Sequence, residues 1–345
     1  MTTRCRPRVA VLGRGEDARR WAAALDGLAR VSPVPEELPG AIDALVLARG
    51  VSDPFARAKE ALLAGVPVLY AAPFLLSPWQ AGVLRDLGRR HELVLRFFEP
   101  FRYRPGFAFL RRALEGSEPL WRPLYVRTVC LAAPGGPGRI DELATDQLAL
   151  CDALLDWQPR HVVASPAQRG DAGDVCAAFL VVHSCEGPVA QCTISVAEPT
   201  EARQLVAVTP EGTIVMDDLD PVASLRILRE SEEEVVVGEG RTPVRARNER
   251  MVASSEDPVV AEARLFVEGV RAAARSVSNG DRWVRVASLW WAARQSLTFG
   301  GREEVPVPLL AARDTEPPPL RVIEGGGKTT VRVAGSRPAL TVVSR

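Results

Sequence analysis

Two carboxylates stand four residues apart in the segment ELATD, at Glu142 and Asp146. In a helix this spacing brings both side chains to one face, and the crowding of two negative charges raises the pKa of one carboxyl group. Such a pair can serve as a general acid and a general base. The alternative is two solvated carboxylates on the flank of a helix, and the spacing alone leaves both interpretations open.

A second candidate site is the turn in VAVLGRGEDA, where Gly13, Gly15 and Ala18 follow a short apolar run. A dinucleotide-binding turn has this pattern. The first glycine allows the sharp turn, the second lets the backbone approach a pyrophosphate, and a small third residue packs the helix on the strand. Glycine turns also occur without a ligand. If a nucleotide binds, we expect these three residues to hold it.

The acidic residue that would hold an adenosine ribose is absent from its expected place, about 20 residues after the first glycine. That place falls around Ser32 to Pro35, where two prolines interrupt the strand, and the next strand begins at once in AIDALVLARG. Glu36 or Glu37 could substitute, although a solvated carboxylate in a turn is the alternative. We therefore predict a shortened adenosine-ribose region.

Polar side chains also follow two later predicted strands. Tyr70 ends one apolar run, and Glu99, Arg102 and Tyr103 follow the next. Doubly wound sheets bind ligands at the carboxyl ends of their strands, so we expect Glu99, Arg102 and Tyr103 to line a ligand cleft. Tyr70 is a further candidate for proton transfer. Arg102 could instead support the wall of the cleft.

The histidines and cysteines predict no metal site. His91 lies between a predicted helix and a predicted strand, while His161 and His183 fall within predicted strands, where structural imidazoles are the commoner case. The six cysteines contain no C-x-x-C pair. We therefore expect neither a bound metal ion nor a disulfide.

The elements that must position these groups alternate over the first part of the chain. Apolar runs such as RVAVL and VPVLY are typical of buried strands, and DPFARAKEALLAG and LSPWQAGVLRDLGRR of amphipathic helices. Alternating strands and helices favour a doubly wound parallel sheet with helices on both faces. We predict a Rossmann-like domain of this kind over residues 1–115.

The pattern then changes to successive strands. Strand-like segments joined by Glu-Gly turns predict an open antiparallel sheet, and two late helices, roughly 258–275 and 281–297, flank it. We predict an α+β domain over residues 116–305. A Pro- and Gly-rich C-terminal extension with short strands follows over residues 306–345.

The composition limits the class of protein. A chain of 345 residues with 47% hydrophobic and 25% charged residues is typical of a soluble globular protein of about two domains. The formal net charge is zero and no basic cluster interleaves with aromatic residues, so nucleic acid is not an expected partner. No run of about 20 apolar residues and no cleavable apolar leader occurs, so we expect a cytoplasmic protein without a membrane partner.

The order of these segments resembles the Gfo/Idh/MocA oxidoreductases, the relatives of glucose-fructose oxidoreductase and inositol dehydrogenase. The matching stretches are VAVLGRGEDA, ALLAGVPVLYAAP, FRYRP, ELATD followed by LLDWQP, TPEGTIVMDD, and EARLFVEGVRAAARS with SLWWAARQSLTFGGREEVPV. The similarity spans residues 8 to about 305. It implies a two-domain fold in which a nicotinamide nucleotide and a substrate meet between the domains.

This sequence departs from the family's motifs at two catalytic positions. The family's E-K-P segment places a lysine beside the nicotinamide, and those three positions are here Ala71, Ala72 and Pro73. The family's D-x-x-x-H helix carries an acid and a histidine, and the following LLDWQP anchors Glu142 at the acid position and Asp146 at the histidine position. The resemblance therefore implies a degenerate member.

Three functions are open on these grounds. We favour a non-redox binding or accessory protein without a cofactor, whose ligand is a peptide or a small-molecule intermediate of a bacterial-type metabolic or natural-product pathway. The first alternative is a divergent NAD(P)-dependent oxidoreductase that uses Glu142, Asp146 or Tyr70 for proton transfer. The second alternative is a cofactor-free lyase or isomerase that uses Glu142 and Asp146.

One face of the predicted antiparallel sheet lacks an evident cover. Alternating residues in DVCAAFLVVHS and VAQCTISVA would expose an apolar patch on that face. We therefore predict a homodimer through this face of the sheet. Internal cover, partly by the C-terminal extension, is the alternative.

Overall fold

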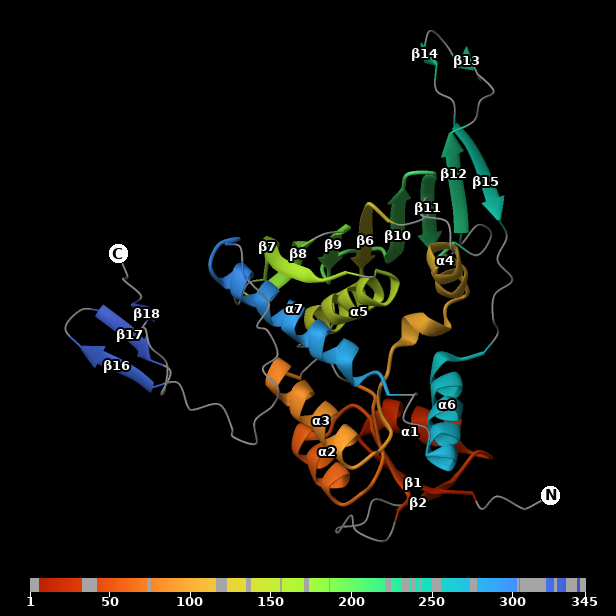
Figure 1. Cartoon of the computed structure of the whole chain (residues 1–345), viewed down its shortest axis with the longest axis vertical. Coiled ribbons are helices and arrows are strands. Elements are labelled where there is room, and N and C mark those ends of the chain that lie inside the picture. The colour runs from red at the N-terminus through yellow and green to blue at the C-terminus, as the bar shows by residue number, and fades with distance from the viewer. Residues whose placement is uncertain are drawn as a thin grey trace. The chain divides into compact units, whose positions relative to one another are not determined.

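The chain forms two compact units, Met1–Leu309 and Leu310–Arg345 (Figure 1). The computed structural model describes residues 6–32, 42–72, 76–115, 123–134, 138–155, 157–170, 174–185, 187–220, 225–230, 236–237, 240–241, 244–249, 256–273, 278–302, 304, 321–325, 328–332 and 340–341. The second unit holds a three-stranded antiparallel sheet of β16 (Arg321–Gly325), β17 (Lys328–Arg332) and β18 (Leu340–Thr341).

Five parallel strands form the first sheet of the larger unit, in the order β2-β1-β3-β4-β5. Their bounds are β1 Arg8–Leu12, β2 Arg30–Ser32, β3 Ala44–Leu47, β4 Val68–Tyr70 and β5 Leu95–Phe97. The chain moves from β1 to β2 on one side and then to β3, β4 and β5 on the other, so the strand order reverses between β1 and β3. Doubly wound sheets bind their ligands beyond the carboxyl ends of the strands at such a reversal.

Helices cover both faces of this sheet. They are α1 (Gly15–Leu25), α2 (Pro54–Leu63), α3 (Pro78–Arg90) and, from far later in the chain, α6 (Pro258–Ala272). Side chains cap the N-termini of three of them. Asp53 accepts a hydrogen bond from the Ala56 amide at 3.0 Å, Ser77 and Gln80 form a capping box, and Asp257 accepts from the Val259 amide at 2.7 Å at the start of α6. These caps satisfy amide groups that would otherwise lack an acceptor, which explains where α2 and α3 begin.

The late helix α6 completes the layer over one face of the parallel sheet. Trp21 of α1 and Phe266 of α6 are buried in one cluster together with Val9 of β1. Burial of large apolar side chains between the two helices holds them together. The first sheet is thus finished by residues that lie beyond the second sheet in sequence.

Eight strands form the second sheet, in the order β15-β12-β11-β10-β6-β9-β8-β7. Their bounds are β6 Tyr125–Leu131, β7 Pro159–Arg169, β8 Val175–Ser184, β9 Val189–Ser195, β10 Ala202–Thr209, β11 Gly212–Asp217, β12 Leu225–Glu230 and β15 Val244–Glu249. Neighbouring strands are antiparallel except β6 and β9, which are parallel. A short hairpin, β13 (Val236–Val237) with β14 (Gly240–Arg241), stands apart.

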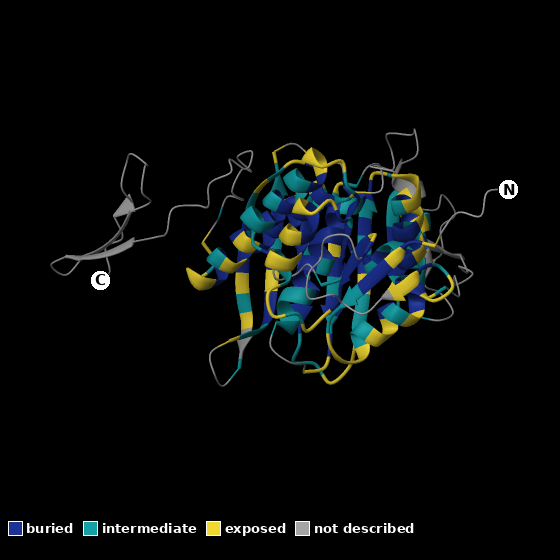
Figure 2. Ribbon diagram, turned by 90° about the horizontal axis from the view of Figure 1, so that it is seen from below, coloured by how far each residue is buried: buried dark blue, intermediate teal, exposed yellow. Residues whose placement is uncertain are grey.

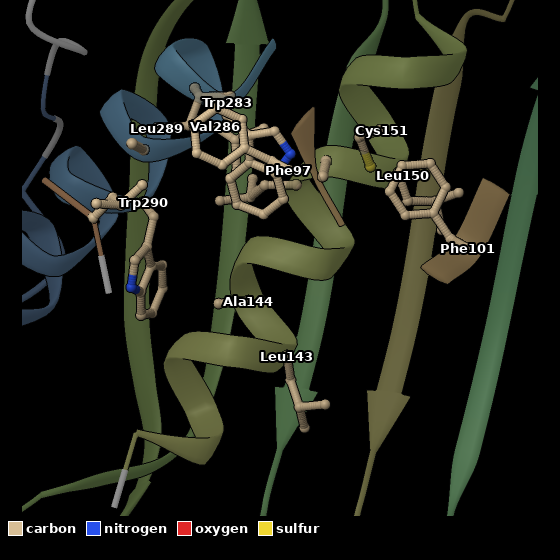
Figure 3. Packing of buried hydrophobic residues seen from close by; sticks show 14 of the residues in the cluster. Phe97, Phe101, Leu143, Ala144, Leu150, Cys151, Trp283, Val286, Leu289 and Trp290 are labelled. Atoms are coloured by element: carbon tan, nitrogen blue, oxygen red, sulfur yellow. The ribbon is translucent and has the colours of Figure 1, made fainter. Parts of the chain in front are cut away.

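Two helices, α5 (Arg139–Leu154) and α7 (Gly280–Thr298), cover one face of the second sheet (Figure 3). Trp283 of α7 also contacts Phe97 of β5, with ring centroids 5.7 Å apart, so α7 packs against both sheets. A 3-10 turn η2 (Pro100–Tyr103) and helix α4 (Pro105–Glu115) connect the two sheets.

The opposite face of the second sheet is only partly buried. Residues along β6, β8 and β9 alternate between buried and half-buried or exposed, and the Phe179 side chain of β8 is 46% exposed (Figure 2). Such alternation is typical of a sheet with one face on the core and one face toward solvent. No described helix covers this outer face.

The predicted fold class is confirmed: a Rossmann-like parallel sheet precedes a mostly antiparallel sheet with flanking helices. The parallel pair of β6 and β9 was not expected, because sequence patterning reports which face a strand buries and not its direction. The domain boundaries at residues 115 and 305 stay predictions. None of the described helices has the length and apolar character needed to cross a membrane.

Candidate functional site

A cleft of about 310 Å³ opens at the carboxyl ends of the parallel strands, where α5 and the second sheet approach them. The parallel part contributes Asp17 of α1, Arg49 after β3 and Ala71 after β4, and helix α5 contributes Glu142 and Asp146. Five arginines and three carboxylates line the cleft in the part of the chain that the structure describes. The cleft is therefore highly charged.

The glycine turn after β1 lies next to this cleft and needs both glycines. A Cβ atom on Gly13 would lie 2.7 Å from the Cβ of Ala48 and 3.3 Å from the Cβ of Ala18, closer than side chains pack. Gly15 has a φ of +73°, which favours glycine, and nothing lies within 4 Å of the place its Cβ would take. The turn thus brings bare backbone to an open position.

Helix α1 begins at this turn without a side-chain cap. Its N-cap residue is Arg14, which makes no capping hydrogen bond. The amide of Arg14 donates to the carbonyl of Arg49 at 2.9 Å, and the amide of Arg49 donates to Asp17 at 2.8 Å, so the turn is tied to the loop after β3. Uncapped amides at the start of a helix can bind an anion such as a pyrophosphate.

An ion pair crosses the cleft from Arg49 to Glu142. The Arg49 guanidinium donates two hydrogen bonds to the Glu142 carboxylate, and Arg139 donates a further one at 2.9 Å. Burial favours a raised pKa for Glu142, but the hydrogen bonds and charges of Arg49 and Arg139 outweigh it and lower the pKa. Glu142 is therefore ionised and held in place at neutral pH.

Asp146 lies one helical turn further along α5, in a different environment. Its side chain is 18% exposed. Arg104 donates to Asp146 over a long distance, 3.4 Å, because the same guanidinium also pairs with Asp218 at 2.7 Å. Burial raises the pKa of Asp146, and the charges of Arg104 and Arg203 oppose this rise only in part. The pKa of Glu142 is thus lowered and that of Asp146 raised, a difference typical of acid and base pairs in enzymes.

The second sheet supplies a thiol and a guanidinium to the same cleft. Cys130 of β6 and Arg203 of β10 stand directly opposite each other in register, and both line the cleft. Burial raises the pKa of Cys130 to about 11, so the thiol is protonated at neutral pH. Cys130 therefore lines the cleft near Asp146 as an uncharged side chain.

The two alanines at the family's lysine segment lie at the end of β4. Ala71 lines the cleft and Ala72 is half-buried, while Pro73 lies outside the described residues. Among the described residues that line the cleft there is no lysine. Among the arginines that line the cleft, Arg49 and Arg104 are the closest along the chain to the carboxyl ends of parallel strands.

Tyr70 does not line the described cleft. It is buried against Phe97, with ring centroids 5.8 Å apart, and its hydroxyl has no hydrogen-bond partner among the described residues. Burial raises the pKa of Tyr70 far above its usual value. The structure therefore directs this side chain into the core between the parallel sheet and its helices.

Glu99, Arg102 and Tyr103 make contacts within their own segment and with helices α6 and α7, away from the cleft. Glu99 is fully buried and pairs with Arg102 and, at 3.3 Å, with Arg282 of α7. The Tyr103 hydroxyl donates at 2.6 Å to Glu262 of α6. None of the three is among the residues that line the cleft. They hold helices α6 and α7 against the segment that follows β5.

The arginines of the cleft were missed by reasoning from sequence. Arg49 lies two residues beyond the end of a buried strand of the parallel sheet, which is a usable signal for a ligand-site residue. Arg104 lies one residue beyond the pair Arg102 and Tyr103 that we singled out. No sequence signal distinguishes Arg203 from the other polar residues of its strand.

Comparison with known proteins found one curated relative and several solved structures of similar fold. No protein-family model matches the chain. One curated protein, UDP-N-acetylglucosamine 3-dehydrogenase from Acidithiobacillus ferrooxidans, is 29% identical over 197 residues. That match covers 55% of this chain and 60% of the relative, so the chain spans less than two thirds of the curated protein.

Solved structures match over nearly their full length. The structure of the same Acidithiobacillus ferrooxidans enzyme has a TM-score of 0.73 and 22% identity, with 85% of this chain and 97% of that chain covered. GenD2 from gentamicin A biosynthesis, solved in complex with NAD, has a TM-score of 0.70 and 20% identity over 87% of this chain and 96% of its own. Levoglucosan dehydrogenase in complex with NADH has a TM-score of 0.69 and 13% identity, over 88% and 99%.

These similarities overturn two expectations from the sequence. The preferred interpretation, a non-redox binding or accessory protein, was wrong, and so was the preference for no cofactor, because the matching proteins are named dehydrogenases and some hold NAD or NADH. The error came from several altered motifs taken together: the alanines at the family's lysine segment, Asp146 at its histidine position and the shortened ribose region suggested that the redox chemistry had been lost. The glycine turn is still present beside the cleft, and the cleft itself holds a carboxyl group with a raised pKa, that of Asp146.

Proposed function

We propose that this chain, which has the two-domain fold of the Gfo/Idh/MocA oxidoreductases, is an NAD(P)-dependent oxidoreductase that acts on a hydroxyl or carbonyl group of a small substrate. The observation that carries the proposal is a single cleft that joins the region of the glycine turn to Asp146. The fold similarity and the partial match to a UDP-N-acetylglucosamine 3-dehydrogenase support the same class of reaction.

The residues at the turn fit a nicotinamide nucleotide. Gly15 leaves open space at a backbone position with positive φ, and the uncapped start of α1 offers amide donors. A Cβ atom on Gly15 would occupy that space, so we assign Gly13, Gly15 and Ala18 to the pyrophosphate. When bound, the nucleotide supplies the acceptor or donor of a hydride.

Asp146 is the group that we assign to proton transfer. A carboxyl group exchanges a proton near neutral pH most effectively when its pKa is raised toward that range, as burial does here. Asp146 would accept the proton of a substrate hydroxyl in oxidation and return it to the carbonyl oxygen in reduction. It occupies the position that the resemblance gives to a histidine.

Glu142 has a different role in this proposal. Its lowered pKa keeps it charged, and its ion pairs with Arg49 and Arg139 fix the start of α5 against the loop after β3. We therefore assign Glu142 to positioning: it keeps the helix that carries Asp146 at a set distance from the nucleotide turn.

Nucleotide binding tests the proposal directly. We expect NADH or NADPH to bind the purified chain at micromolar concentration in fluorescence or calorimetric titrations, and Gly15→Ala to weaken binding by at least tenfold. Gly27→Ala is the matched control, because Gly27 also has a positive φ (+76°) and open space around its Cβ position, but lies at the far end of α1. Both variants cost about 1 kcal/mol of stability through backbone strain.

The two variants separate binding from stability. Equal loss of stability with weakened binding only in Gly15→Ala supports the assignment. The absence of binding of either nucleotide to the unaltered chain, or equal binding by both variants, would overturn it.

A further inference from the structure

The arginines of the cleft differ in how firmly they are paired. Arg20 pairs with Asp257 at 2.7 Å, and Arg104 pairs with Asp218 at 2.7 Å. Arg49 and Arg139 share Glu142, the latter at 2.9 Å. Arg203 is the exception. Within the described residues it pairs with Glu201 at 3.6 Å, and the Glu201 side chain is half exposed. An exposed pair at that distance contributes little and is easily exchanged for another anion.

The position of Arg203 on β10 places it in the part of the cleft that holds Asp146. Its residue stands opposite Cys130 on the neighbouring strand, and opposite residues of paired strands share one face. That face is the one covered by α5, the helix that carries Asp146. The carbonyl of Arg203 accepts a hydrogen bond from the Asp218 amide at 2.9 Å, which fixes the strand beside the Arg104 pair. The charge of Arg203 acts on Asp146, Asp218 and Cys130, which agrees with this placement.

Arg104 and Arg203 therefore have different tasks. Arg104 is 18% exposed and lies between two carboxylates, and both of its terminal nitrogens donate to them. Arg203 is 35% exposed and has no ion pair within 4.0 Å to either of those carboxylates in the described part of the chain. A guanidinium presents a planar set of N–H donors that matches a carboxylate or a phosphate.

We propose that Arg203 binds an anionic group of the substrate, a carboxylate or a phosphate, and so makes the cleft specific for acidic substrates. This rests on the proposed function, in which Asp146 exchanges a proton with the same substrate. An uncharged substrate of equal size would bury the guanidinium without a partner, and an unpaired buried charge is costly. Arg203 is thus a specificity-determining residue and not a proton donor.

Calorimetric titration of the full chain, with and without saturating NADH, tests this. The probes are D-gluconate, D-glucose 6-phosphate and uncharged D-glucose. We expect at least one anionic probe to bind tenfold or more tightly than D-glucose, and its binding to weaken as salt is added. Arg203→Gln is expected to lose that preference while NADH binding and the melting temperature stay unchanged.

Arg127→Gln is the matched control. Arg127 lies on β6, close to Cys130, but its side chain is exposed on the outer face of the sheet. It should leave all three titrations unaltered. Arg203→Lys keeps the charge and loses the planar set of donors, so its affinity for the anionic probe should fall between those of the unaltered chain and Arg203→Gln.

The outcomes separate the ligand classes and the two proposals. Tighter binding of D-gluconate points to a carboxylate, and tighter binding of D-glucose 6-phosphate to a phosphate. If neither anion binds better than D-glucose, or Arg203→Gln binds both as the unaltered chain does, the role of Arg203 is refuted. NADH binding in that case leaves the proposed function intact, whereas anion binding without any nucleotide binding would refute the proposed function alone.

Discussion

Arg49, which follows β3, and Glu142, in the first turn of α5, form an ion pair that joins the parallel sheet to the helix that carries Asp146. Both residues line the cleft that also holds Asp146, and the glycine turn lies beside this cleft. The ion pair therefore couples the stability of the site to the ionisation of one carboxyl group.

The ion pair predicts a pH-dependent contribution to stability. The folded pKa of Glu142 lies below its unfolded value of 4.5, so its contribution is fully present above that value and is lost as the pH falls through the folded pKa. We expect Glu142→Gln to lower the free energy of unfolding by about 1 kcal/mol at pH 7, since the pair is partly exposed. Urea unfolding at pH 7 and pH 3 measures this. A difference between the two proteins that persists unchanged at pH 3 would contradict it.

Asp146→Asn separates stability from turnover. The folded pKa of Asp146 is raised, so its charged form opposes folding above the unfolded pKa, and the amide should be no less stable at pH 7. We expect nucleotide binding to be retained and turnover of a substrate found by screening to fall about 100- to 10,000-fold. Steady-state kinetics and thermal unfolding measure the two effects. Turnover equal to that of the unaltered chain would remove Asp146 from the mechanism.

Arg104 and Asp218 should shift the pKa of Asp146 in opposite directions. Removing the positive charge in Arg104→Gln raises it, whereas Asp218→Asn removes a negative charge and frees Arg104 for Asp146, which lowers it. The other groups that face Asp146, namely Arg203, Glu142 and Cys130, are unaltered in both variants. The acidic limb of the pH–rate profile, or a carbon-13 titration of the Asp146 carboxyl group, reports the shift. Shifts in the same direction would show that the Arg104 bridge does not tune Asp146.

The outer face of the second sheet leads us to propose a homodimer. Phe179 is 46% exposed there and Val181, on the same face of β8, is half-buried, so a second copy would remove apolar surface from water. We expect light scattering to give a dimer mass at working concentrations, and Phe179→Glu to give a monomer that still binds the nucleotide. A monomeric mass for the unaltered chain would exclude this arrangement.

The cleft carries positive charge even though alanine occupies the family's lysine position. Ala72 stands where the resemblance gives a lysine, and this absence suggested that the redox function had been lost. A motif position reports one side chain and is silent about the groups that other elements bring to the same cleft. Here Arg49, Arg104 and Arg203 supply positive charge from three elements that are distant in sequence.

The local signals in the sequence were sufficient for the elements and for two parts of the site. The apolar run before Gly13 and Gly15 defines a strand, a tight turn and a helix, and the spacing of Glu142 and Asp146 places both on one side of α5, because each feature depends on residues within a few positions of one another. Only the tertiary structure decided which groups meet. It buried Tyr70 and Glu99, placed Tyr103 in a half-buried contact with α6, and brought Arg203 of β10 into the cleft of Asp146. Such proximity depends on how two sheets pack and not on periodicity along the chain.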